Sequence, residues 1–83
     1  MKGENLQSLV EFVAQSLVDV PDEVRVDRYQ RGTIVNLELN VSKGDMGRVI
    51  GKSGQVANAI RTLLKVAAAR EGNRVNLEII EPR

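Results

Sequence analysis

A short segment in the second half of the chain, Gly51-Lys52-Ser53-Gly54, holds residues whose types and spacing suit the binding of a phosphate. Glycine lacks a Cβ and adopts positive φ readily, so another main chain can approach these positions closely. A helix is predicted to begin directly after Gly54, and the start of a helix presents unpaired N–H groups and a partial positive charge. Lys52 adds a full positive charge. The segment therefore predicts an anion site.

The same spacing also has a purely structural interpretation. Two glycines three residues apart permit a tight turn between helices, and a chain with seven glycines in 83 residues produces such a spacing readily by chance. A second match, Gly44-Asp45-Met46-Gly47, illustrates this. Its aspartate would repel a phosphate and no long helix begins directly after it, so we interpret that second match as a turn.

A nucleotide hydrolase is one alternative, because Gly51-Lys52-Ser53 has the residues that end a phosphate-binding P-loop. That loop requires a glycine five residues earlier, where this chain has Met46. The chain contains no cysteine and no histidine, which excludes thiol nucleophiles, the usual zinc sites and histidine-dependent catalytic triads. We therefore expect no enzymatic activity, no metal, no cofactor and no small-molecule substrate.

Positive charge gathers around the glycine segment, although the net charge of the chain is only +1. Residues 1–32 hold four basic and six acidic side chains, whereas residues 43–65 hold five basic side chains and one acidic one. A local field of this sign favours a nucleic-acid partner. Basic side chains on a helix are also common on an ordinary solvated face, and for Arg61 and Lys65 that interpretation stays open.

The surrounding pattern predicts the elements that would hold this segment. Apolar residues at helical spacing predict helices over 5–18 and 55–71, with one or two further helical turns over 45–50. Asn5 is expected to cap the first helix and Gly72 to end the long one. Alternation predicts strands over 24–30, 33–41 and 75–80, the first two forming a hairpin. A strand–helix–helix–strand crossover makes the second and third strands parallel.

The predicted fold class is therefore α+β, in the order α-β-β-α-α-β, with a three-stranded mixed sheet and three helices on one face. The apolar stripes of both long helices, with Phe12 beside the first, are expected to form the core with the valines of the strands. RNA-binding sheets that stack bases need aromatic side chains, and the chain has only Phe12 and Tyr29. No signal-like start or membrane-length apolar run is present, so we expect a cytoplasmic protein without a membrane partner.

The wider sequence resembles a known family. The stretch from Asp45 to Gly54, DMGRVIGKSG, is similar to the signature of K-homology (KH) domains, in which a GxxG loop clamps about four nucleotides of single-stranded RNA or DNA. The element order is similar to the type II, prokaryotic KH arrangement. Nearly the whole chain, taken as one KH domain over 1–83, resembles the small bacterial single-KH proteins of the KhpA family. The likeness includes the opening helix, Leu17-Val18-Asp19, Pro21-Asp22-Glu23-Val24, Ala59-Ile60-Arg61-Thr62 and Ala67-Ala68-Ala69.

This resemblance implies a role for each residue of the segment and its neighbours. Gly51 and Gly54 would allow close approach of an RNA backbone, Lys52 would face a phosphate, and Ser53 would donate to another phosphate oxygen. The further residues implied are Ile50 as a wall of the groove for bases, Gln55 and Asn58 as contacts to base edges or sugars, and Arg48 as a source of positive field. Gln55 and Asn58 stand where the family often has basic residues, a departure that bears on affinity more than on the binding mode.

The resemblance also implies partners. The ligand would be single-stranded RNA, or single-stranded DNA, and the protein would self-associate or pair with a larger KH protein (KhpB, also called Jag or EloR). The family is linked to RNA chaperone and regulatory activity, cell-wall synthesis and cell length. A protein-interaction module in which RNA binding is secondary or absent is the alternative class.

Overall fold

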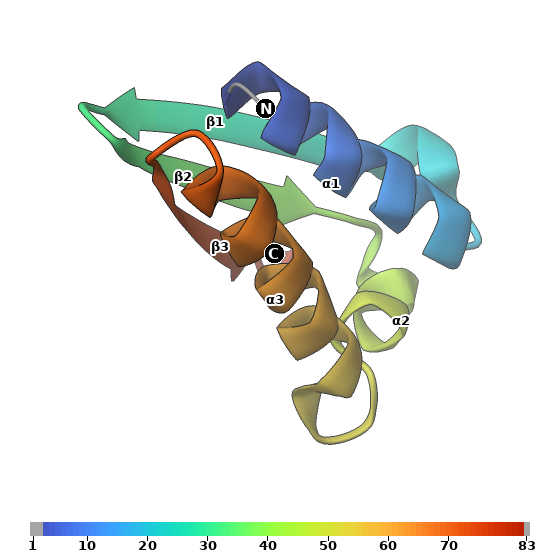
Figure 1. Ribbon diagram of the computed structural model, residues 1–83. Helices are drawn as coiled ribbons and strands as arrows, with labels where there is room; N and C mark the ends of the chain where they lie inside the picture. Colours follow the sequence, from blue (N-terminus) through green and yellow to red (C-terminus); the bar gives the residue numbers. More distant parts are fainter. Residues whose placement is uncertain (1–2, 83) are drawn as a thin grey trace.

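The helices and strands follow one another in the predicted α-β-β-α-α-β order (Figure 1). The computed structural model describes residues 3–82, with side chains from residue 5 onward. Its elements are α1 (Gly3–Leu17), β1 (Arg25–Arg31), β2 (Ile34–Asn40), α2 (Met46–Ile50), α3 (Gln55–Ala69) and β3 (Arg74–Ile79). Short 3₁₀ turns cover Pro21–Glu23, Lys43–Asp45 and Lys52–Gly54. Within residues 3–82, no helix combines the length and the apolar composition that crossing a membrane would require.

One mixed sheet holds the three strands in the order β1-β2-β3. β1 pairs antiparallel with β2 through a hairpin, and β2 pairs parallel with β3. The connection from β2 to β3 runs through α2 and α3, as a parallel pair requires. Both long helices lie across the same side of the sheet, and α2 lies beside the lower part of α3 (Figure 1). The predicted fold class and strand directions are confirmed.

The hydrophobic core lies between the sheet and the two long helices. Side chains at alternate positions of β2, Val35, Leu37 and Leu39, are almost fully buried against the helices. The buried residues that face them are Leu6, Val10 and Ala14 from α1 and Ile60, Leu64 and Ala68 from α3. Their spacing of four residues forms one stripe on each helix, which is why these segments are amphipathic.

Of the two capping residues predicted from the sequence, one is wrong and one is confirmed. α1 already includes Gly3 and Glu4, so Asn5 lies inside the first turn and the prediction that it caps the helix is wrong. Gly72 ends α3 as predicted, with φ of 71°. The N–H of Gly72 donates to Ala69 O at 3.1 Å and the N–H of Asn73 donates to Ala68 O at 3.0 Å, which is the Schellman arrangement.

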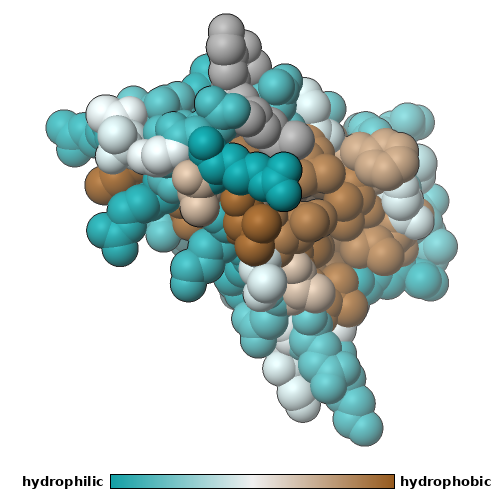
Figure 2. Space-filling view, in the orientation of Figure 1, coloured by the Kyte–Doolittle hydropathy of each residue, from teal (hydrophilic) through white to brown (hydrophobic). Residues whose placement is uncertain are grey.

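Part of each predicted apolar stripe is exposed, contrary to the expectation that the stripes and Phe12 are core. Four side chains form what we call the apolar face: Phe12 and Leu17 of α1 with Leu63 and Val66 of α3, which are 69%, 37%, 49% and 56% exposed. Two of them, Leu17 and Leu63, line a groove of about 390 Å³ between α1 and α3. Figure 2 shows apolar side chains gathered over the region where these two helices lie together. The helices leave this side uncovered because the sheet packs only on the other.

The outer side of the sheet is polar and carries a row of carboxylates. In the strand register, Asp27 pairs with Glu38 and Glu38 pairs with Glu78. Like charges directly opposite each other on neighbouring strands repel. Arg25 offsets part of this charge, because its Nε lies 3.4 Å from Asp27 Oδ2. We call these three residues the acidic row.

Candidate nucleic-acid interface

The Gly51–Gly54 segment forms a tight, exposed loop between α2 and α3. α2 ends at Ile50, and the N–H of Gly51 donates to Gly47 O at 2.8 Å. The φ of Gly51 is 76°, and Gly54 has φ of 75° and ψ of 13°. α3 begins directly after Gly54, as the sequence predicts. Both glycines therefore occupy backbone conformations that other residues rarely adopt.

The two glycines differ in what surrounds them. A Cβ on Gly51 would lie 2.5 Å from Val56 Cγ2 and 2.9 Å from the Val56 main-chain nitrogen. Gly51 is thus required by the packing of the loop against α3. A Cβ on Gly54 would meet nothing closer than Asn58 Nδ2 at 3.8 Å. The side of Gly54 is open, which is the arrangement that allows another main chain to approach.

Between the glycines, Lys52 and Ser53 project from the loop and both are exposed. Ser53 has φ of 56° and ψ of 26°, a left-handed conformation that is uncommon for a residue with a Cβ. The N–H of Gly54 donates to Gly51 O at 3.2 Å and the N–H of Gln55 donates to Lys52 O, so the loop closes as a tight 3₁₀ turn. Successive main-chain N–H groups in such a turn form a concavity of the kind that attracts anions. The Lys52 ammonium beside them adds a full positive charge.

A groove of about 500 Å³ lies between α3 and the edge strand β3. Three basic side chains line it, Arg61 and Lys65 of α3 and Arg74 of β3, with Asn73 and Asn76. No acidic side chain is part of this lining among the residues that the structure describes. Arg61 is fixed, because its Nε donates to Leu77 O at 3.2 Å and its Nη1 to Asn58 Oδ1 at 3.4 Å.

Sequence reasoning left Arg61 and Lys65 open and did not single out Arg74, Asn73 or Asn76. The signals were present. Arg61 and Lys65 are four residues apart, so they share one side of α3. Arg74 and Asn76 follow the turn that brings β3 alongside α3. The link that sequence reasoning did not make is that Asn73, Arg74 and Asn76 lie across a groove from Arg61 and Lys65.

The other predicted site residues divide between two sides of α3. Asn58 lies toward the basic groove through its hydrogen bond with Arg61. Gln55 instead lines the groove between α1 and α3. Ile50 is partly buried and packs against the hydrophobic core. The roles of these residues toward a ligand stay predictions.

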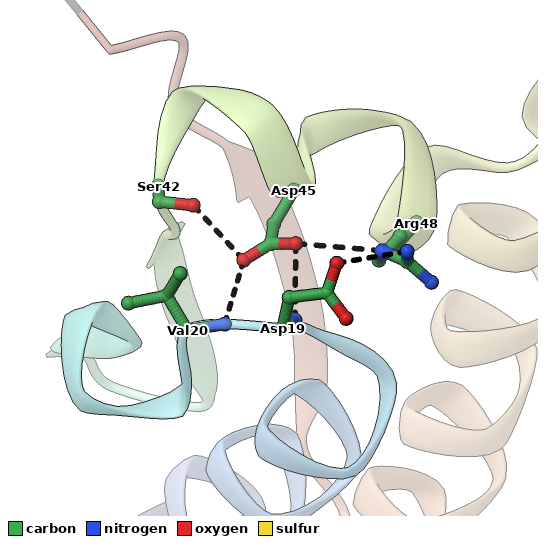
Figure 3. A network of polar contacts seen from close by, with 5 residues as sticks. All are labelled: Asp19, Val20, Ser42, Asp45 and Arg48. Carbon is green, nitrogen blue, oxygen red and sulfur yellow. Dashed lines mark hydrogen bonds and ion pairs between the residues drawn. The ribbon is translucent and has the colours of Figure 1, made fainter.

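Arg48 points toward the end of α1 and is held by two carboxylates (Figure 3). Its Nη2 lies 2.8 Å from Asp19 Oδ2, and its Nε lies 3.5 Å from Asp45 Oδ1. The guanidinium is about half exposed. A role for Arg48 in supplying field to a nucleic acid stays a prediction, and these ion pairs reduce the charge that it can present.

Asp45 is the buried member of this network, and sequence reasoning, which placed it in a turn and at the start of the helical turns over 45–50, missed that role. The turn exists, but the carboxylate is 2% exposed and is the sole buried polar side chain among the described residues. Its Oδ1 accepts from the N–H of Asp19 at 3.0 Å, and its Oδ2 accepts from the N–H of Val20 at 3.0 Å. The Ser42 hydroxyl also donates to Oδ2, at 2.9 Å. Figure 3 shows these contacts converging on one carboxylate.

The network lowers the pKa of Asp45 below the usual aspartate value. The main-chain N–H of Asp19 contributes most, and the Ser42 hydroxyl, the Val20 N–H and the Arg48 charge act in the same direction. Burial opposes them because it disfavours the charged form. Asp45 is therefore ionised at neutral pH.

Comparison with known proteins is consistent with this architecture. The family model described as "KhpA/KhpB, KH domain" matches residues 7–79. The "RNA-binding protein KhpA" of Clostridium acetobutylicum is 51% identical over 90% of this chain and 100% of its own length. Proteins of that name from Halalkalibacterium halodurans and Chlamydia trachomatis are 45% and 41% identical, over 92% and 94% of this chain and all of their own length. On these grounds the chain belongs to the KhpA/KhpB family of KH domains.

Proposed function

We propose that this protein binds single-stranded RNA through the Gly51–Gly54 loop and the basic groove between α3 and β3, without catalysing a reaction. The observation that carries the proposal is the exposed loop, where Lys52 and the left-handed Ser53 lie between two glycines of positive φ, the second of which is open. The relatives bear the name "RNA-binding protein", which supports RNA as the ligand.

Each part of the surface has a distinct task in this proposal. The loop grips the sugar–phosphate backbone, because its N–H groups and Lys52 match phosphate oxygens and Gly54 leaves room for the strand. The groove then receives the following nucleotides. Arg61, Lys65 and Arg74 attract the backbone, while amides such as Asn73 and Asn76 offer donors and acceptors to base edges.

The loop assignment is tested by replacing Lys52 and Ser53 with aspartate together. The variant places two negative charges where the phosphate should lie, and we expect at least a ten-fold loss of affinity for a 12-nucleotide single-stranded RNA at low salt. Folding should survive because both side chains are exposed and aspartate tolerates the left-handed conformation of Ser53. Fluorescence anisotropy measures binding, and circular dichroism checks the fold.

A matched control is the double variant Arg31→Asp with Thr33→Asp, in the turn of the hairpin. It changes the net charge by the same amount on an exposed turn, at the other end of the molecule from the loop (Figure 1). We expect that control to lose less affinity than the loop variant, because the turn lies at the other end of the molecule from the loop and approaches only the far end of the basic groove, where Thr33 O accepts from the N–H of Arg74 at 2.8 Å. Equal losses in both variants, or no loss in the loop variant, would overturn the site.

A second function, docking to another KH protein, is favoured by the apolar face. Its four side chains are exposed, and two of them, Leu17 and Leu63, line an apolar groove that water alone would have to cover in a single copy. We infer that a second copy of this chain, or a larger KhpB-like KH protein, covers it. In that setting the protein would act in the cytoplasm as an RNA chaperone or post-transcriptional regulator, with effects on cell-wall homeostasis and cell length as the family resemblance implies.

Self-association is tested with Phe12→Ser, which removes the largest exposed side chain of the apolar face. Multi-angle light scattering over a range of concentrations should give a dimer for the parent protein and a monomer for the variant. The control is Tyr29→Ser, since Tyr29 is a similarly exposed aromatic residue on β1. A monomeric parent that captures a KhpB-like protein through Phe12 would favour the mixed pair, and binding of neither would reject docking at this face.

A further inference from the structure

The Asp45 carboxylate joins two segments that lie far apart in the sequence. Through its hydrogen bonds it connects the chain leaving α1, at Asp19 and Val20, with the turn that enters α2. The N–H donors belong to the main chain, so the carboxylate fixes the path of the backbone and not merely a pair of side chains. All three hydrogen bonds are 3.0 Å or shorter.

α2 depends on such anchoring because it is only five residues long. A helix of that length is unstable alone, since too few hydrogen bonds form to offset the cost of nucleation. Val49 is buried in the core, and Ile50 packs against it. Asp45 anchors the end at which the helix begins, and the more exposed Arg48–Asp19 ion pair adds a weaker link to the segment after α1.

The loop begins where α2 ends, so the position of α2 determines the position of the loop. The N–H of Gly51 donates to Gly47 O inside α2, and the N–H of Gly54 donates back to Gly51 O at 3.2 Å. The other side of the loop is set by the close contact between Gly51 and Val56 of α3. Rotation or displacement of α2 would therefore change the directions of the N–H groups of Lys52 and Ser53.

We propose that Asp45 is a positioning residue for nucleic-acid binding: anchored on the N–H groups of Asp19 and Val20, its carboxylate holds α2 so that the Gly51–Gly54 loop keeps its phosphate-accepting shape. The inference rests on the proposed function of that loop. According to this inference, a buried acidic residue that touches no ligand is required for binding a polyanion.

The direction of the change in RNA affinity distinguishes a positioning role of Asp45 from a simple effect of its charge. Asp45→Asn removes one negative charge, which by charge alone would strengthen RNA binding. We expect the opposite, a loss of roughly three- to thirty-fold in affinity, because the asparagine amide cannot accept from all three donors and its NH₂ group would face N–H groups. Binding is measured by anisotropy well below the melting temperature of the variant.

The chain offers a matched control in Asp19→Asn. It is the same chemical change in a neighbouring residue, but the N–H of Asp19 that donates to Asp45 belongs to the main chain and remains. The variant only releases the Arg48 ion pair, so its affinity for RNA should be unchanged or slightly higher. Asp45→Asn binding as tightly as the parent, with an intact fold, would overturn the proposal.

Amide hydrogen exchange without RNA tests the positioning directly and covers the case in which Asp45→Asn does not fold. Ser42→Ala removes one of the three hydrogen bonds. We expect it to speed exchange at Gly51 and Gly54 several-fold more than at the central strand β2, which reports global unfolding. Uniform acceleration would mean that Asp45 only stabilises the fold. If the parent protein binds no RNA but the loop amides respond, the proposed function fails while the positioning of the loop stands.

Discussion

Gly51 and Gly54 share a motif, yet their surroundings predict different consequences of substitution. Gly54→Ala places a Cβ in open space and costs only the strain of a left-handed residue, about 1–2 kcal/mol of unfolding free energy. Gly51→Ala adds a clash with Val56 to the strain of positive φ, so its cost should exceed that of Gly54→Ala by roughly 1–3 kcal/mol. Urea unfolding of both variants measures the difference.

The RNA affinity of the two variants should depend on a different property, namely whether the added methyl group occupies the space of the ligand. The methyl group of Gly54→Ala occupies the space that the proposed RNA backbone would approach, so affinity should fall although most stability is kept. An unfolding free energy equal in both variants would contradict the geometry of Gly51. Normal RNA affinity of a folded Gly54→Ala protein would contradict close approach at that position.

Single residues also mark where prediction from the sequence stops. The two glycines of the loop could be assigned in advance, because positive φ and the start of α3 both leave a signature in residue types. The ion pair between Arg48 and Asp19 could not be predicted in this way, because Asp19 is remote in the sequence and reaches Arg48 only after α1 and α2 have packed. The left-handed Ser53 gives no signal either, because serine is not a residue that this conformation favours.

At the scale of elements, the connection between α1 and α2 predicts a specific dependence on pH. The pKa of Asp45 is lower in the folded protein than in the unfolded chain, so its ionised form stabilises the fold. This stabilisation is complete above the unfolded pKa of about 3.9 and is lost as the pH falls through the lower folded value. The melting temperature of the parent protein should therefore approach that of Asp45→Asn below about pH 4.

Thermal melts of both proteins between pH 7 and pH 2 provide the measurement. Other carboxylates also titrate in this range, but they are common to the two proteins and their effects largely cancel in the difference. A difference in melting temperature that stays constant down to pH 2 would show that the charge of Asp45 does not stabilise the fold.

Element order and strand pairing followed from periodicity, whereas the exposure of individual apolar residues did not. At about 100° per residue, Phe12 lies well outside the arc that Leu6, Val10 and Ala14 define, so it was never aligned with the sheet. Leu17 falls inside that arc, but it is the last residue of α1 and is exposed at the helix end. On α3, Leu63 lies about 60° from the buried Ile60, at the margin of that helix's stripe. How far the three-stranded sheet covers each helix is a limit that only the assembled structure reveals.

Across the whole molecule, unpaired positive charge gathers around α3. The basic groove with the loop carries Lys52, Arg61, Lys65 and Arg74, whereas on the outer side of the sheet the acidic row is offset by arginines. The small net charge therefore conceals a local excess of positive charge. Roughly two to four phosphates should be neutralised on binding, so the log–log slope of affinity against salt concentration on single-stranded RNA should be about −1.5 to −3.

Titrations between 50 and 300 mM KCl determine this slope. Lys65→Gln should make it shallower by about 0.7, which is the contribution of one phosphate on a single strand. Glu38→Gln should leave it unchanged, since the acidic row lies away from the groove. A slope much steeper than −3 would mean that the contact surface is larger than the loop and the groove, and an unchanged slope in Lys65→Gln would remove that residue from the interface.

The acidic row has a consequence for any activity that brings two complementary RNA strands together. Because the acidic row offsets Arg25, Arg31 and Arg74 on the same side of the sheet, that side offers no net positive charge to a polyanion, and we expect each copy to hold a strand at the loop and groove only. Annealing would then require two copies, each contributing one strand, and its rate would depend on the square of the protein concentration until the copies associate.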